Sequence, residues 1–343
     1  MAVMNKGLII WSIILFGAVT AASYWWFIVN KAEESMILSP IARVVEKPVE
    51  KYSFNRLATS EYKGSQIVID EVLEEDEDFV VSKFWYEVEG KIITGQLNTP
   101  TRVASASGYP VVIMLRGYIN PETYTTGDGT RNAAAYFARN GFVTVAPDFL
   151  GYGGSDEEDA DSMASRMKRP VAVLELVASL NRIAGVDEGR VFMWGHSNGG
   201  QIALSVLEIM GRSQQFAGLV VPATLWAPVS KPFPYSILYY TDEYEDGGKA
   251  LRKVLADFEK DYDVDLYSIH QYYDWIRSPI QVHQGTGDDA IPLVWSDELV
   301  ERLEELEKEV IYFTYPGADH DMRPVWDTVV ERDVEFFLRF NRS

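Results

Sequence analysis

The chain contains no cysteine among its 343 residues. This absence excludes disulfide bonds, a thiol nucleophile, and metal or iron–sulfur sites that need thiolate ligands. Histidine is also scarce, with four residues in the chain. No stretch resembles a phosphate-binding P-loop or a dinucleotide-binding fingerprint. We therefore expect a protein that functions with neither a cofactor nor a metal.

Positive charge is in short supply as well. The chain carries 31 lysine and arginine residues against 51 aspartate and glutamate residues, which gives a formal net charge of -20. A surface of this sign repels phosphate backbones, so we expect no nucleic-acid partner. Hydrophobic residues make up 47% of the chain, which is enough for one large core.

One long apolar run lies near the N-terminus. Residues 7–29 carry no charged side chain, and about 20 apolar residues suffice to cross a bilayer. A cleaved signal peptide is the alternative, but the apolar run continues well beyond the possible cleavage point. We predict that residues 1–30 form a single-pass membrane anchor that leaves the bulk of the protein outside the cytoplasm, and that residues 31–60 form a tether.

From residue 61 to residue 343 the pattern is that of one α/β domain. Three strands of an antiparallel meander come first, with Glu89-Gly90 as a hairpin turn. Continuous apolar runs then alternate with segments of helical periodicity, which indicates a mostly parallel sheet flanked by helices. The predicted strands are 67–73, 79–88, 91–97, 110–115, 142–147, 190–194, 217–222, 280–284 and 310–315. The predicted helices are 132–139, 171–183 (with Pro170 near its start), 201–210, 295–306 and 326–340.

Residues 228–277 interrupt this alternation. The segment is rich in tyrosine, other aromatic residues and acidic residues. Long insertions in compact domains are often lids or binding loops. We predict a small, mainly helical, aromatic-rich cap over the sheet, with a packed insertion of no catalytic role as the alternative.

The sequence Gly195-His196-Ser197-Asn198-Gly199 has the pattern of a nucleophile elbow, G-x-S-x-G. It follows an apolar strand-like run and precedes an apolar run of helical periodicity. A serine on such a sharp turn needs strained backbone geometry and small neighbours. We therefore predict Ser197 as a nucleophile, against the alternative of a surface serine on a tight turn.

A serine hydroxyl needs a base to take its proton. Of the four histidines, His196 adjoins the serine and its side chain should point elsewhere. His270 falls in the cap, and His283 falls inside a predicted strand. His320 follows the last predicted strand, in a loop from which its side chain can reach across the strand ends. We predict His320 as the general base.

A carboxylate must orient this base. Asp288 and Asp289 follow the penultimate strand, and either one gives the chain order serine, aspartate, histidine of the α/β-hydrolase triad. Attack by the serine on a carbonyl carbon leaves negative charge on the carbonyl oxygen, and this oxyanion needs two hydrogen-bond donors. We assign these to the backbone N–H of Asn198 and to Tyr118, through its backbone N–H or its hydroxyl.

Six sequence fragments resemble those of the prolyl-oligopeptidase-like serine peptidases of the α/β-hydrolase superfamily, and they occur in the same order along the chain. The fragments are Leu115-Arg116-Gly117-Tyr118, Asp148-Phe149-Leu150-Gly151-Tyr152-Gly153-Gly154-Ser155, Val186-Asp187-Glu188-Gly189-Arg190-Val191, Gly195-His196-Ser197-Asn198-Gly199-Gly200, Gly285-Thr286-Gly287-Asp288-Asp289 and Gly317-Ala318-Asp319-His320. The resemblance implies Ser197 as nucleophile, His320 as base and Asp288, rather than Asp289, as the acid. It also implies peptide-bond hydrolysis as the activity.

Oligopeptidases of this family usually carry a β-propeller before the catalytic domain. The roughly 50 residues between the predicted anchor and the catalytic sheet are too few for one. Ester hydrolysis by a membrane-anchored carboxylesterase is therefore the second hypothesis, and an inactive binding module on the same fold is the third. Either enzyme would take a small peptide or ester as its substrate.

Overall fold

A computed structural model describes Trp25, Trp26 and residues 47–341 of the chain. The chain divides into two units, Met1–Lys47 and Pro48–Ser343. Apart from the two tryptophans, the predicted anchor lies outside the described residues. The helices in the described part of the chain are too short or too polar to span a bilayer.

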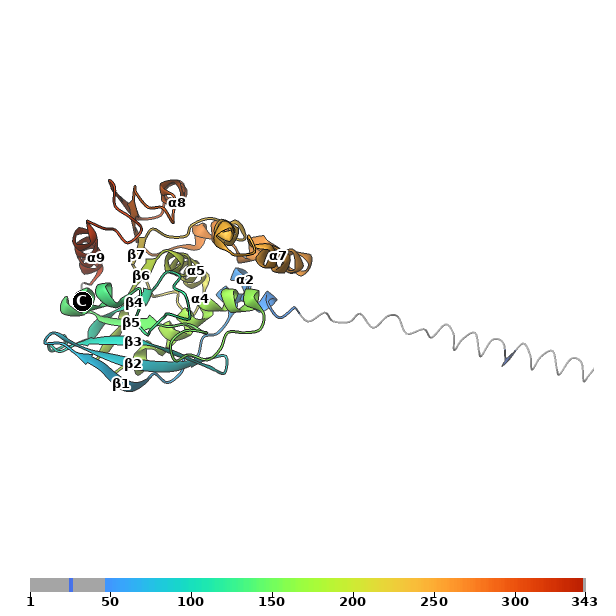
Figure 1. The fold of residues 1–343 in the computed structure, drawn as a ribbon. Coiled ribbons are helices and arrows are strands. Elements are labelled where there is room, and N and C mark those ends of the chain that lie inside the picture. Colours follow the sequence, from blue (N-terminus) through green and yellow to red (C-terminus); the bar gives the residue numbers. More distant parts are fainter. Residues whose placement is uncertain (1–24, 27–46, 342–343) are drawn as a thin grey trace, which may run out of the picture. The chain divides into compact units, whose positions relative to one another are not determined.

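Within residues 48–341 the strands form one nine-stranded sheet in the order β1-β2-β3-β5-β4-β6-β7-β8-β9 (Figure 1). The strands are β1 (Val68–Glu75), β2 (Phe79–Val88), β3 (Lys91–Pro100), β4 (Tyr109–Leu115), β5 (Val143–Pro147), β6 (Val186–His196), β7 (Ala223–Trp226), β8 (Ile280–Gly285) and β9 (Val310–Tyr315). The pairs β1–β2, β2–β3 and β3–β5 are antiparallel, and every other pair is parallel. The predicted mostly parallel α/β sheet is confirmed.

The hairpin between β2 and β3 fixes the register of the antiparallel edge. Its two turn residues, Glu89 and Gly90, have φ values of 49° and 78°. Two successive positive φ angles are the geometry of the tight turn that matches the twist of paired strands. The strands pair without a shift from Val88 and Lys91 to their far ends.

Helices cover both faces of the sheet (Figure 1). They are α2 (Phe54–Thr59), α3 (Arg131–Arg139), α4 (Ser162–Ser179), α5 (Asn198–Arg212), α6 (Tyr235–Leu238), α7 (Lys249–Asp261), α8 (Leu293–Glu305) and α9 (Trp326–Phe340). Short 3-10 turns are η1 (Glu50–Tyr52), η2 (Leu180–Arg182), η3 (Thr241–Glu243), η4 (Val264–Tyr267), η5 (Ile269–Gln271) and η6 (Tyr273–Trp275).

The central strands send alternate side chains into two hydrophobic layers, as the two-residue period of a strand requires. Along β4, Val111 and Ile113 face α4 and α5, whereas Val112 and Met114 face α3 and α9. All four side chains are fully buried. Burial on both faces explains why these strands read as continuous apolar runs.

Helix α4 begins earlier than the sequence pattern predicts. The prediction placed Pro170 near the start of a helix at 171–183, but the helix starts at Ser162 and Pro170 lies inside it. The carboxylate of Asp161 accepts hydrogen bonds from the backbone N–H groups of Met163 and Ala164, and this cap fixes the true start. Pro170 has no N–H, so the carbonyl of residue 166 lacks its usual helical donor.

Two other boundaries are corrected by the structure. The predicted strand at 217–222 is irregular, and the strand begins only at Ala223, because Pro222 cannot donate a ladder hydrogen bond. The predicted tether, residues 31–60, is wrong at its C-terminal end. Residues 48–60 belong to the catalytic unit, where the ring of Phe54 stacks 4.7 Å from that of Tyr272.

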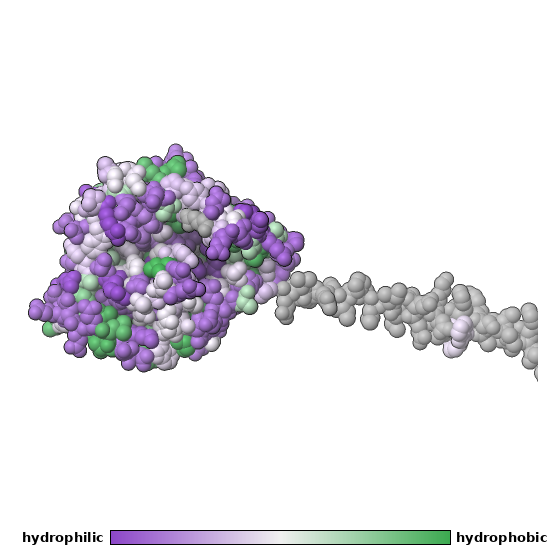
Figure 2. Space-filling model, viewed as in Figure 1, coloured by the Kyte–Doolittle hydropathy of each residue, from purple (hydrophilic) through white to green (hydrophobic). Residues whose placement is uncertain are grey.

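The segment between β7 and β8 is helical, as predicted for the cap. It contains α6, α7 and four 3-10 turns. Part of its aromatic content is core, since Phe233, Tyr267 and Tyr273 are buried. Tyr235, Tyr239 and Tyr244 are exposed. Most of the face shown in Figure 2 is hydrophilic, with hydrophobic residues in separate small patches, as the net charge of the chain leads us to expect.

Helix α5 also carries a buried acid. Glu208 is 0% exposed, and neither of its carboxyl oxygens has a hydrogen-bond partner among the described residues. Burial, together with the charge of Asp274, raises the pKa of Glu208 well above its usual value. The folded protein therefore keeps this carboxyl protonated to a higher pH than the unfolded chain does, in which it ionises above a pH of about 4.3. Its contribution to the free energy of unfolding consequently falls as the pH rises.

Replacing this acid should stabilise the fold. We expect Glu208→Met to raise the free energy of unfolding by about 1–3 kcal/mol at pH 7, because it removes a buried group without partners. Glu208→Gln serves as the matched control, since it removes the titration but keeps buried polar atoms. Urea unfolding between pH 5 and pH 8 checks both variants. A Glu208→Met protein that is less stable than the parent would contradict this account.

Candidate active site

Ser197 lies at the turn between β6 and α5, with φ 56° and ψ -121°. A positive φ is costly for a residue with a side chain and is found where the surroundings hold it in place. A Cβ atom at Gly199 would lie 1.9 Å from the backbone oxygen of Leu115. The predicted strand, turn and helix around the serine are therefore confirmed, and the need for glycine beside it has a steric cause.

The backbone of Ser197 is anchored on both sides. Its N–H donates to the carbonyl of Trp226 at 2.9 Å, and its carbonyl accepts from the N–H of Gly200 and of Val229, each at 3.0 Å. Two of these partners, Trp226 and Val229, lie at and just beyond the end of β7. The neighbouring strand end thus holds the turn in its strained conformation.

His320 and Asp288 form the second half of the site. The Nδ1 atom of His320 lies 2.8 Å from Oδ2 of Asp288, whose side chain is fully buried. The other carboxyl oxygen, Oδ1, accepts from the backbone N–H groups of Ala290 and Ile291 at 2.9 and 2.8 Å. Gln284 Nε2 also donates to Oδ2, at 3.1 Å.

These contacts keep Asp288 ionised. Burial alone would raise the pKa of Asp288. Its net pKa is lowered, because it accepts hydrogen bonds from His320 and from the backbone of Ile291 and Ala290, and because His320 can carry a positive charge. A charged carboxylate orients the histidine ring and stabilises the imidazolium. The structure brings the two predicted residues into contact, and it leaves the alternative, Asp289, exposed.

The remaining histidines occupy other environments. His283 Nε2 lies 2.9 Å from Asp333, but both side chains are fully buried and cannot meet a substrate. His270 lies in the cap, with its Nδ1 atom 2.7 Å from the hydroxyl of Ser268. This agrees with the choice of His320 by elimination.

His196 has a role that the sequence did not indicate. We expected its side chain to point elsewhere, but its ring packs 4.6 Å from the ring of His320, and its Nε2 lies 3.0 Å from the His320 carbonyl oxygen. A carbonyl only accepts, so Nε2 of His196 must carry the proton. Burial and the charge of His320 lower the pKa of His196 to about 4, so the ring is neutral near pH 7. It fixes the His320 loop against the elbow.

The loop after β4 approaches the nucleophile closely. A Cβ atom at Gly117 would lie 3.0 Å from the Cβ and 3.5 Å from the Oγ of Ser197. Tyr118 and Asn198 line one small cavity, and the N–H of Asn198 belongs to the first turn of α5, where such groups lack helical acceptors. The structure thus places both predicted oxyanion residues beside one another, while the Tyr118 side chain is 72% exposed.

Arg116 holds this loop, a role that we did not predict from the sequence. The side chain is buried, and it donates to the carbonyls of Gly117 and Asp148, each at 2.9 Å. Its guanidinium also lies over the rings of Tyr124 and Tyr152, at 4.4 and 3.9 Å. No sequence motif distinguishes this arginine from a solvated one.

Comparisons with known proteins identify the family and the fold. Residues 129–341 match the prolyl oligopeptidase family. The structure resembles acetyl xylan esterase 1 from Thermoanaerobacterium, with TM-score 0.55 and 17% identity over 84% of this chain and 94% of that one. It also resembles dipeptidyl peptidase 4 from Porphyromonas gingivalis, with TM-score 0.53 and 15% identity over 81% and 36%. Est1E from Butyrivibrio proteoclasticus with bound ferulic acid gives TM-score 0.53 and 18% identity over 74% and 98%. These similarities establish the shared α/β-hydrolase fold.

Removing the charge of Asp288 should disable the site. We expect Asp288→Asn to lower kcat by roughly 10³–10⁴-fold, because the amide cannot stabilise the imidazolium or hold the same tautomer of His320. Asp289→Asn is the matched control and should keep the activity of the parent. Steady-state kinetics on an activated ester, with circular dichroism to verify folding, checks both. Equal losses in the two variants would contradict the assignment.

Proposed function

Because the chain belongs to the prolyl oligopeptidase family, we propose that this serine hydrolase cleaves peptide bonds through an acyl-enzyme on Ser197. The observation that carries the proposal is the contact of His320 with the buried, ionised Asp288, on a loop that His196 ties to the elbow of Ser197. An amine is a poor leaving group and must be protonated as the C–N bond breaks. A histidine oriented by a carboxylate supplies that proton.

The proposed reaction has two halves. Ser197 Oγ attacks the substrate carbonyl carbon while Nε2 of His320 takes the hydroxyl proton. The oxyanion accepts hydrogen bonds from the N–H of Asn198 and from Tyr118. The C–N bond then breaks, and His320 gives its proton to the departing amine. In the second half water attacks the acyl-enzyme, His320 takes a proton from it, and Ser197 leaves with that proton.

Ester hydrolysis is the second candidate. One structural neighbour above is named an acetyl xylan esterase, and another is Est1E with bound ferulic acid. This chain spans 94% and 98% of those two chains. An alkoxide or phenoxide leaves more readily than an amine, so the same residues serve either reaction. The two candidates differ in substrate and not in catalytic residues.

A matched pair of substrates tests the proposal. We expect the parent to hydrolyse both an anilide and an ester with the same acyl group, and Ser197→Ala and His320→Ala to lose roughly 10³-fold or more on each. Chromatographic detection of the released acid checks this.

The outcomes separate the candidates. Hydrolysis of the ester alone would favour the carboxylesterase. A folded parent that hydrolyses neither substrate, or a Ser197→Ala variant with unchanged rates, would overturn the proposed mechanism, and a binding role on the same fold would then be the best account.

We also propose that residues 7–29 anchor the enzyme in a membrane with its catalytic unit outside the cytoplasm. The support is the length of this uncharged apolar run. We expect the full chain to sediment with membranes and to resist extraction with carbonate, and residues 31–343 to stay in the supernatant. Protease protection of intact cells reports the side. A full chain that is found in the supernatant would contradict the anchor.

A further inference from the structure

A cavity beside the elbow brings together residues from α4, α5 and the start of the cap. Its polar lining includes Arg166, Arg169, Asn198, Gln201 and Ser236, together with the hydroxyl-bearing residues Tyr52, Ser205 and Tyr267. Its apolar walls come from Phe54, Met167, Ile202, Phe233, Ile237 and Ile269. Asn198 is also the residue that we assign as an oxyanion donor, so the cavity opens directly next to the reacting carbonyl.

Arg166 is a cation in this cavity without a matching carboxylate. It is half-buried, and it makes no ion pair with any side chain that the structure describes. Glu158, an acid whose charge acts on Arg166, instead pairs with Arg169 at 3.5 Å. Burial and the charge of Arg169 lower the pKa of Arg166 to about 10, so the guanidinium is still charged at neutral pH.

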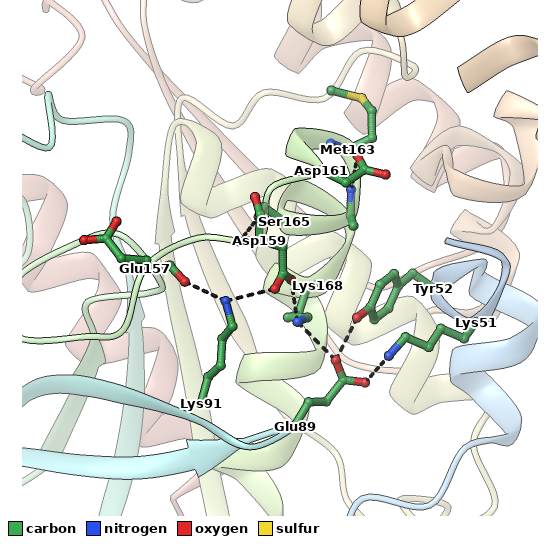
Figure 3. A network of polar contacts seen from close by, with 11 residues as sticks. Lys51, Tyr52, Glu89, Lys91, Glu157, Asp159, Asp161, Met163, Ser165 and Lys168 are labelled. Carbon is green, nitrogen blue, oxygen red and sulfur yellow. Dashed lines mark hydrogen bonds and ion pairs between the residues drawn. The ribbon is translucent and has the colours of Figure 1, made fainter. Parts of the chain in front are cut away.

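Lys168, which projects from the other side of α4, is a buried cation that does have carboxylate partners. Lys168 is 8% exposed at its side chain and contacts two carboxylates, Asp159 at 2.5 Å and Glu89 at 3.3 Å (Figure 3). Glu89 also accepts from Tyr52 and Lys51, each at 2.7 Å. Residues two positions apart project from opposite sides of a helix. Among the described residues, Arg166 lines its cavity without a carboxylate partner of this kind, so an external anion bound there would be its counterion.

Ser236 supplies a second, independent observation. Its side chain is 2% exposed, and its hydroxyl has no hydrogen-bond partner among the described residues. Buried hydroxyls are nearly always satisfied, because an unpaired one costs about 1–3 kcal/mol. Ser236 lines the same cavity as Arg166. An oxygen acceptor in the cavity would satisfy both groups at once.

The cavity lies on the acyl side of the scissile bond. The leaving group must be within reach of His320, which protonates it. None of the described residues that line this cavity comes from the His320 loop or from β8. The cavity instead adjoins the small space formed by Tyr118 and Asn198, where the oxyanion would lie. A substituent on the acyl group therefore extends toward Arg166.

We propose that this cavity binds a carboxylate at the far end of the acyl group, with Arg166 and Ser236 as the specificity-determining residues and Arg169 as a second positive charge. The inference rests on the acyl-transfer function proposed for Ser197. It defines the substrate class as acyl donors with a second carboxylate. These are either monoesters of dicarboxylic acids or peptides with Asp or Glu on the acyl side of the cleaved bond.

Two esters of equal chain length test this preference. 4-Nitrophenyl hydrogen glutarate and 4-nitrophenyl pentanoate differ only in the terminal carboxylate. We expect the parent to prefer the glutarate in kcat/KM, after correction for spontaneous hydrolysis, and Arg166→Gln to lower the glutarate-to-pentanoate ratio by about tenfold or more. Arg166→Lys should restore part of the ratio and Ser236→Ala should lower it moderately.

The control is Arg302→Gln, which removes an exposed charge on α8 and should leave the ratio unchanged. Because the readout is a ratio, partial loss of folded protein does not affect it. A parent that hydrolyses both esters without preferring the glutarate, or an Arg166→Gln variant with the parent's ratio, would overturn the anion site and leave the serine mechanism intact. Failure of the parent on both esters would overturn the proposed function itself.

Anilides of matched peptides that end in Glu or Gln distinguish the two sources of the carboxylate. Faster release from the Glu peptide, lost in Arg166→Gln, would identify acidic peptides as substrates. Preference for the glutarate ester without any preference between the peptides would identify small dicarboxylic monoesters. No preference in either pair would contradict the proposal.

Discussion

The strained backbone of Ser197 is the constraint on which the rest of the site depends. A residue at φ 56° reverts to an ordinary conformation unless its neighbours prevent it. Hydrogen bonds to Trp226, Val229 and Gly200 hold it, and they originate in the parallel sheet and the helix that follows. The burial of β4, β6 and β7 between two helical layers thus stabilises a local conformation that would be unfavourable in an isolated peptide.

The same sheet brings the other groups to the serine. In parallel strands the carboxyl ends meet at one edge, so the loops after β4, β8 and β9 converge there with the elbow. Asp288 is fixed by its own loop amides before it meets His320, and His196 ties the His320 backbone to the elbow. Little reorganisation is then needed during the reaction, which is the condition for electrostatic stabilisation of a transition state.

The features that could be predicted from the sequence are those that depend on short stretches of the chain. The elbow, the Glu89-Gly90 turn and the choice of His320 each depend on motifs a few residues long or on the scarcity of histidine. The predicted start of α4 was wrong because a proline usually marks the first turn of a helix. Here the cap at Asp161 and tertiary packing start the helix earlier and outweigh the effect of Pro170. The roles of His196 and Arg116 depend on contacts with residues far along the chain, which no local pattern records. The unpaired state of Arg166 is likewise visible only in three dimensions.

Mass mapping of the enzyme after reaction with a fluorophosphonate shows whether Ser197 is the nucleophile, because that reagent modifies only an activated serine in this class of site. We expect one adduct per chain, located on the peptide that contains Ser197, with loss of activity in proportion to modification. His320→Ala should react far more slowly. Modification at a different residue, or activity that survives complete modification of Ser197, would contradict the account.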